Sequence, residues 1–233
     1  MIILSFSISG SIVHTFRLLS SDLRRIVLDT RDLNIKKVEY IDDVQRSQKS
    51  LTYYIENYNY ITNSKNEQLV IELPKGLASE YGSIIKVKIE YSVNKKATAV
   101  SWVPKEQTFD GKHPFLYTQC EAIHCRSIAP LQDSPAIKST FNATIRIKEP
   151  YLAIVSGLLV SNKTEEGMRI YEYEQKIPVP SYLLALVAGD IHYKKVSKRT
   201  GVFAESTKLN EIAEELSEME VFLNIVILIF IYR

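Results

Sequence analysis

The sequence predicts an all-β fold, built as a sandwich or as a large twisted sheet of mostly antiparallel strands. Ile, Val and Thr account for 56 of the 233 residues, and Tyr adds 14 more. Such β-branched and aromatic side chains suit the pleated, half-buried surface of a sheet. Residues 85–93 and 141–147 alternate strictly between apolar and polar side chains. This period of two is typical of strands that have one buried face and one solvent-exposed face.

Shorter runs bounded by Pro and Gly predict the remaining strands. Strands are expected at residues 12–18, 25–29, 36–40, 51–55, 68–73, 99–104, 154–159, 169–177 and 183–188. The last contains the unbroken apolar run LLALVA and is expected to be buried on both faces. Residues 42–67 are polar and rich in Tyr and Asn, which indicates a hairpin or a loop. The basic run at 194–199 is expected to be a solvated hairpin.

The end of the sequence departs from the β pattern. Leu209, Ile212, Ala213 and Leu216 recur at helical spacing, which predicts one helix over residues 206–223, capped by Ser206 or Thr207. Residues 221–232 read VFLNIVILIFIY. This run is too short for a membrane-spanning helix and has the composition of an aggregation-prone strand. We therefore expect no membrane span, and an exposed tail that promotes association.

The amino-acid composition of the chain argues against some classes of function. The 29 basic and 27 acidic residues leave a net charge of +2, which is too balanced for a dedicated nucleic-acid binder. The first basic residue is Arg17, so no signal peptide is expected. The two cysteines are typical of a reducing compartment, and a cytoplasmic location is expected.

No complete catalytic motif is present in the sequence. The four histidines include no pair at the spacing of a His-Glu-x-x-His zinc helix. The densest polar cluster runs from Tyr117 to Arg126. Two functional interpretations of this cluster are possible. One is a zinc site with the ligands Cys120, His124 and Cys125, and the other is a cysteine nucleophile with His124 as its base. The favoured interpretation is two buried thiols, with Arg126 paired to a carboxylate such as Asp133.

Residues 115–135 resemble the N-terminal domain of the zinc aminopeptidases of peptidase family M1, in particular the leukotriene A4 hydrolase branch. The run that carries the resemblance contains Gln-Cys-Glu, then Ala-Ile-His-Cys-Arg and Gln-Asp-Ser-Pro. Residues 28–33 (LDTRDL), 176–189 (KIPVPSYLLALVAG) and 215–220 (ELSEME) are similar to further family segments in the same order. The resemblance covers residues 8–223.

The resemblance implies a saddle-like β domain at residues 1–203, and at 204–223 the first helix of a catalytic domain. Residues 224–233 match nothing in the family. In the family, the segment matching Gln119, Cys120 and Glu121 contacts the substrate, and the third position helps to hold the free α-amine of a peptide. A carboxylate at Glu121 is the choice of general aminopeptidases and argues against a preference for an epoxide lipid.

The sequence also departs from the family pattern. The Gly-x-Met-Glu-Asn strand and the His-Glu-x-x-His motif are missing. We therefore expect a truncated chain that lacks the zinc and helical domains, holds no cofactor itself and is inactive alone, with zinc only in a longer parent. The alternative is a free-standing β-sandwich interaction module that has lost catalysis.

Overall fold

One long sheet runs through the molecule. The computed structural model describes residues 2–4, 7–58, 66–77 and 80–231. The order of the eight strands in this sheet is β13 (Leu158–Glu165), β14 (Met168–Pro180), β11 (Lys138–Lys148), β1 (Ile2–Leu4), β2 (Ser7–Arg17), β8 (Ile84–Val93), β4 (Leu33–Asp42) and β5 (Ser47–Ser50). Neighbouring strands are antiparallel except β1 and β11, which are parallel.

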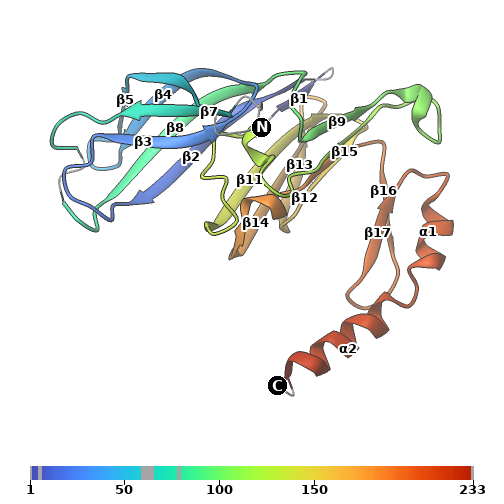
Figure 1. Ribbon diagram of the computed structural model, residues 1–233. Coiled ribbons are helices and arrows are strands. Elements are labelled where there is room, and N and C mark those ends of the chain that lie inside the picture. The colour runs from blue at the N-terminus through green and yellow to red at the C-terminus, as the bar shows by residue number, and fades with distance from the viewer. Residues whose placement is uncertain (1, 5–6, 59–65, 78–79, 232–233) are drawn as a thin grey trace.

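Two smaller sheets cover the two halves of the long sheet (Figure 1). The first consists of β3 (Arg25–Thr30), β7 (Asn66–Glu72) and β6 (Tyr53–Tyr58). The second consists of β12 (Leu152–Val155), β15 (Leu186–Gly189), β10 (Phe115–Thr118) and β9 (Val100–Val103). Each half has its own core, since side chains of β3 and β7 pack with those of β4 and β8, while β9, β10, β12 and β15 pack with β11 and β14. The all-β, mostly antiparallel prediction is confirmed.

The alternating segments behave as their pattern predicts. In β8 the side chains of Ile85, Val87, Ile89 and Tyr91 are buried, while the intervening residues are more exposed. Because successive side chains in a strand point to opposite faces, one face of β8 joins the core and the other meets solvent. The strand expected at 183–188 begins only at Leu186, because Leu183 ends a 3-10 helix and is 49% exposed. Leu186 and Ala188 are buried and Val187 is half-buried, so burial on both faces is wrong for the first half of this run.

Other strand predictions need correction. The single strand expected at 154–159 is two strands, β12 and β13, which belong to different sheets. The chain turns between them, where the amide of Gly157 donates to the carbonyl oxygen of Val155 at 2.7 Å. The polar stretch 42–67 contains β5, β6 and the start of β7, and its residues 59–65 lie outside the described part. Strand β10 was not predicted.

Beyond the sandwich, a hairpin and two helices extend away from it (Figure 1). The hairpin consists of β16 (His192–Lys195) and β17 (Gly201–Ala204), which confirms the hairpin expected from the basic run. The single predicted helix is instead two, α1 (Leu209–Glu215) and α2 (Met219–Ile231). The residue that caps α1 is Lys208, with no side-chain cap, so the capping role expected for Ser206 or Thr207 is wrong.

The apolar tail is helical rather than extended. Within the described residues the tail pairs with no strand, so the hydrogen bonds of a helix, which form within the segment itself, satisfy its backbone. None of the described side chains of α2 is buried. The described part of the chain contains no helix with the length and apolar character needed to cross a membrane.

Candidate functional site

The segment Gln119–Glu121 lies directly after β10, at the end of the second small sheet. The amide of Gln119 donates to the carbonyl oxygen of Ala99 at 2.9 Å, which extends the pairing of β10 with β9. Cys120 is buried, whereas Gln119 and Glu121 are exposed. The side-chain oxygen of Gln119 accepts the amide of Glu121 at 2.9 Å. The Glu121 carboxylate forms no ion pair with another described residue.

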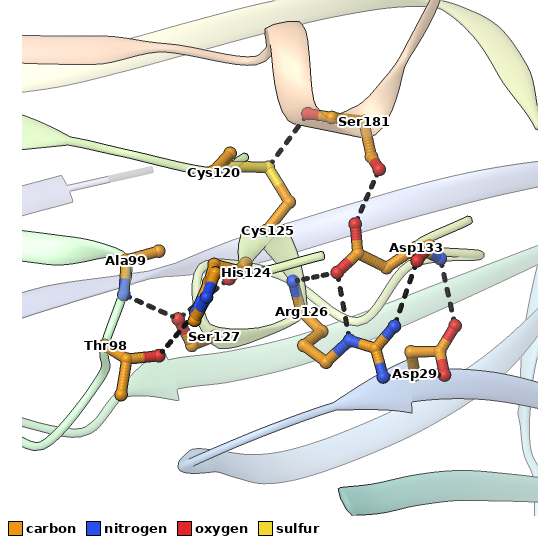
Figure 2. Close-up of polar contacts among 10 residues, drawn as sticks. All are labelled: Asp29, Thr98, Ala99, Cys120, His124, Cys125, Arg126, Ser127, Asp133 and Ser181. Carbon is orange, nitrogen blue, oxygen red and sulfur yellow. Dashed lines mark hydrogen bonds and ion pairs between the residues drawn. A yellow bond between two sulfur atoms is a disulfide. The ribbon is translucent and has the colours of Figure 1, made fainter. Parts of the chain in front are cut away.

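A short turn follows and fixes this segment against the sandwich. The amide of His124 donates to Cys120 O at 2.9 Å, and the turn continues into the 3-10 helix η2 (Cys125–Ser127). The hydroxyl of Ser127 accepts the amide of Ala99 at 3.0 Å and donates to His124 O at 2.9 Å. The ring of His124 also lies 3.2 Å from Thr98 Oγ1. The turn is therefore bonded to the chain just before β9 (Figure 2).

The two cysteines form a disulfide, with Cα atoms 4.6 Å apart. The interpretation as buried thiols is therefore right about burial and wrong about the thiols. The physical reason is the turn itself, which brings Cys120 and Cys125 within bridging distance. Bridged sulfurs are neither zinc ligands nor nucleophiles, because both roles need a thiolate. The zinc site and the cysteine nucleophile considered at Cys120, His124 and Cys125 are thus contradicted.

A buried ion pair lies beneath the turn (Figure 2). The Arg126 and Asp133 side chains are 6% and 0% exposed, and Nε of Arg126 donates to Oδ2 of Asp133 at 3.0 Å. The same oxygen accepts the amide of Arg126 at 3.1 Å, and Oδ1 accepts the hydroxyl of Ser181 at 2.5 Å. A second carboxylate also pairs with Arg126, since Oδ1 of Asp29 lies 3.3 Å from its Nη1. The predicted pairing of Arg126 with Asp133 is confirmed.

This network connects the turn to both small sheets. Asp29 belongs to β3, and its Oδ2 accepts the amide of Asp133 at 3.0 Å. Ser181 begins the 3-10 helix η3 (Ser181–Leu183), which leads into β15. Because buried charged groups are stable only when they are paired and hydrogen-bonded, the network fixes where the turn lies.

One group of described side chains has the geometry to hold a metal ion, and it lies apart from the turn. Ligand atoms of Asp110, His113 and Asp190 all lie within 4.8 Å of one another. No sequence pattern pointed to this group, because Asp190 lies far along the chain from the other two.

Comparison with known proteins decides the family. Residues 2–183 match the family model of the peptidase M1 N-terminal domain. The chain belongs to this family. The match includes residues 115–135 and confirms the resemblance that they carry.

Relatives of this M1 N-terminal domain are considerably longer proteins. The chain is 35% identical over 219 residues to leukotriene A-4 hydrolase from Xenopus laevis, which covers 93% of this chain and 34% of that protein. It is 36% identical over 223 residues to leucine aminopeptidase 2 from Aspergillus clavatus, with the same two coverages. The chain thus spans about a third of the length of these curated relatives.

Solved structures agree with this assignment. A native yeast leukotriene A4 hydrolase superposes with a TM-score of 0.78 at 29% identity, covering 95% of this chain and 33% of that one. An M1 zinc metallopeptidase from Deinococcus radiodurans shares the fold with a TM-score of 0.60 at 18% identity, covering 84% of this chain and 41% of that one. The saddle-like β domain implied by the resemblance is confirmed at the level of the fold.

Proposed function

We propose that this M1 N-terminal domain anchors the free α-amine of a peptide for an aminopeptidase through the segment Gln119, Cys120 and Glu121, in which Gln119 and Glu121 are exposed and the buried, bridged Cys120 holds the segment in place. The observation that carries the proposal is Glu121 itself, an exposed carboxylate without an ion pair among the described residues, on a turn held by a buried network. An exposed carboxylate without an ion pair, carried on a backbone held in place, suits a cationic ligand.

The chemistry of the segment supports binding rather than proton transfer. A peptide ammonium needs acceptors when it leaves water, and a carboxylate provides a charge-assisted hydrogen bond. Holding the amine fixes the first peptide bond relative to the reacting groups, which is catalysis by positioning. The Glu121 side chain supports peptides rather than epoxide lipids as substrates, and leucine aminopeptidase 2 is among the relatives.

The hydrolytic machinery would belong to the remainder of a longer enzyme. This sequence has no His-Glu-x-x-His motif, so it does not supply those ligands for the zinc that the family implies. We therefore propose that the chain is inactive alone and needs the zinc and helical domains as partners. Sequencing the transcript beyond the codon for Leu223 tests whether the chain is part of a longer enzyme. A zinc motif in the same reading frame would support that proposal. A stop codon there supports the free-standing interaction module instead.

A chimaera tests the anchoring role. The N-terminal third of the Xenopus laevis leukotriene A-4 hydrolase is replaced by residues 1–223 of this chain, and hydrolysis of amino-acid anilides is measured. Glu121→Ala should remove one charge-assisted contact, about 1.5–3 kcal/mol. This corresponds to a fall in kcat/KM of about 10- to 150-fold. Zinc content should not change.

The matched control is Glu166→Gln, an exposed carboxylate in the turn between β13 and β14, which should leave kcat/KM unchanged. Full activity of the Glu121→Ala chimaera on substrates with a free amine would show that the segment does not anchor the amine. Chelator-sensitive hydrolysis by the isolated 233-residue chain would contradict its proposed inactivity.

We also propose a cytoplasmic location, which the low cysteine count supports. The Cys120–Cys125 bridge is the feature that argues for an oxidising compartment. Fractionation of cells carrying the tagged protein tests the proposal, and recovery of the protein from a secretory compartment would overturn it.

A further inference from the structure

A cluster of imidazole and carboxylate side chains lies where the chain leaves the sandwich. Asp110 and His113 belong to the loop between β9 and β10, which contains the 3-10 helix η1 (Lys105–Gln107). Asp190 lies between β15 and β16, and His192 begins β16. The hairpin β16–β17 and both α-helices extend away from the sandwich beyond this point (Figure 1). The cluster therefore lies at the joint between two parts of the molecule.

The donor atoms converge on one centre. His113 Nδ1 lies 2.5 Å from Asp110 Oδ2 and 3.4 Å from Asp190 Oδ2. The three side chains are 35%, 17% and 24% exposed, so they are sheltered but reachable from solvent. Asp190 Oδ1 lies 3.4 Å from Nε2 of His192. The imidazole of His113 also packs edge-on against Tyr151, with ring centroids 5.9 Å apart.

The loop holds Asp110 in place. Its Oδ1 accepts the amides of Lys112 at 2.8 Å and His113 at 3.1 Å, and the hydroxyl of Thr108 at 3.0 Å. These bonds leave Oδ2 facing the imidazole of His113. The loop therefore fixes the position of the Asp110 carboxylate beside His113.

The local charge favours a cation. A small pocket is lined by Asp110, His113, Asp190 and Glu205, which brings three carboxylates to one place. Glu205 lies just after β17, and its Oε2 accepts the amides of Phe109 at 2.7 Å and Asp110 at 3.2 Å. A divalent ion would be attracted here and would relieve the repulsion between the carboxylates.

We propose that Asp110, His113 and Asp190 form a binding site for a divalent ion of the zinc class. One imidazole nitrogen and two carboxylate oxygens are a donor set that Zn²⁺ accepts, with bonds of about 2.0–2.2 Å. Ligand atoms on a tetrahedron of that size lie about 3.4 Å apart. The separation of His113 Nδ1 and Asp190 Oδ2 already has this value. The shorter contact with Asp110 opens when the ion replaces the proton between the two side chains.

Such an ion would have a structural role. It would join the β9–β10 loop to the β15–β16 connection and so fix the direction in which the hairpin and helices leave the sandwich. His192, in contact with the far oxygen of Asp190, would orient that ligand from outside. The site is separate from the hydrolytic zinc of the family, whose His-Glu-x-x-His motif is not in this sequence. From the sequence, no metal was expected in this chain. This site was not foreseen because the proposed ligands come from two segments that are far apart in the sequence.

Isothermal titration calorimetry of the metal-stripped 233-residue chain with Zn²⁺ tests the site. We expect one ion per chain, and binding at least about tenfold weaker in Asp190→Asn and in His113→Gln. Asp43→Asn is the control, since this exposed carboxylate in the β4–β5 turn pairs with Lys86 and should not affect binding.

Circular dichroism identifies any variant that fails to fold. In that case Co²⁺ added to the unsubstituted chain gives an independent measurement, because an intense visible absorption band reports a tetrahedral site. Failure of the unsubstituted chain to bind Zn²⁺ would overturn the proposal. Folded Asp190→Asn and His113→Gln variants with unchanged affinity, or Co²⁺ with the weak spectrum of the aqueous ion, would do so as well.

Discussion

Replacing Asp133 by Ala should destabilise the domain strongly. The Asp133 carboxylate is fully buried and accepts hydrogen bonds from the amide and Nε of Arg126 and from the hydroxyl of Ser181. Removing it leaves the guanidinium, itself 6% exposed, without its principal partner. Breaking a buried ion pair in this way costs about 3–5 kcal/mol. A domain has about 5–15 kcal/mol of stability in total, so the loss is a large fraction.

Urea unfolding followed by circular dichroism measures this loss, with the slope of the transition checked for constancy. Replacing both partners, Arg126→Met with Asp133→Leu, should cost less than Asp133→Ala, because no charge is then left buried and unpaired. The control is Glu165→Gln, which removes an exposed carboxylate that pairs with Lys163 on the surface. This change should alter the free energy of unfolding by less than about 1 kcal/mol. A loss below about 1 kcal/mol for Asp133→Ala would refute the reasoning.

Three further outcomes follow from the titrating groups and the tail. Burial lowers the pKa of His14 and outweighs the opposite effect of the hydrogen bond between its Nε2 and Pro130 O. The folded state therefore favours the neutral ring, and stability is lost as pH falls below about 6.5. His14→Gln should flatten the fall in melting temperature between about pH 7 and 5. Bonds from Ser197 and then Arg199 lower the pKa of Glu220 to about 2. Its stabilisation is therefore present above about pH 4.5 and is lost as pH falls toward 2, and the melting temperatures of the wild type and Glu220→Gln should converge over that range. Deleting residues 224–233 removes exposed apolar side chains of α2 and should lower the sedimentation-measured fraction of oligomers; an unchanged fraction would contradict a role in association.

Local patterns predicted those parts of the fold that local physics determines. Alternation identified β8 and β11, because a strand with one buried face needs that period. The continuous run 154–159 was assigned to one strand because periodicity does not show that a chain turns into another sheet, as it does at Gly157. The tail was assigned a strand-like composition, but it forms the helix α2, whose backbone hydrogen bonds form within the segment despite the lower helix propensity of its β-branched residues.

The candidate site was predictable only in part. The pairing of Arg126 with Asp133 followed from the sequence. The disulfide was missed, since the low cysteine count favoured thiols. The group of Asp110, His113 and Asp190 was missed because the approach of Asp190 to the other two depends on the path of the chain through two sheets.

The turn that carries Glu121 depends on a residue from the other half of the sandwich. Asp29 in β3 exchanges backbone hydrogen bonds with Leu131 at 2.7 and 3.2 Å, and its carboxylate contacts Arg126 at 3.3 Å and accepts the amide of Asp133 at 3.0 Å. Asp29→Ala keeps the backbone bonds and removes both carboxylate contacts. The carboxylate is partly exposed, so the expected cost is reduced to about 1–2 kcal/mol.

This cost should appear as local opening of the turn, because Asp29 itself lies outside it. Hydrogen exchange at the amides of His124, Ser127 and Ile128, which are all bonded within the turn, should become about 5- to 30-fold faster. Glu72→Ala on neighbouring β7, an exposed carboxylate, is the control and should leave these rates unchanged. Unchanged exchange in Asp29→Ala would mean that the turn is held by its own bonds. The position of Glu121 would then be independent of β3.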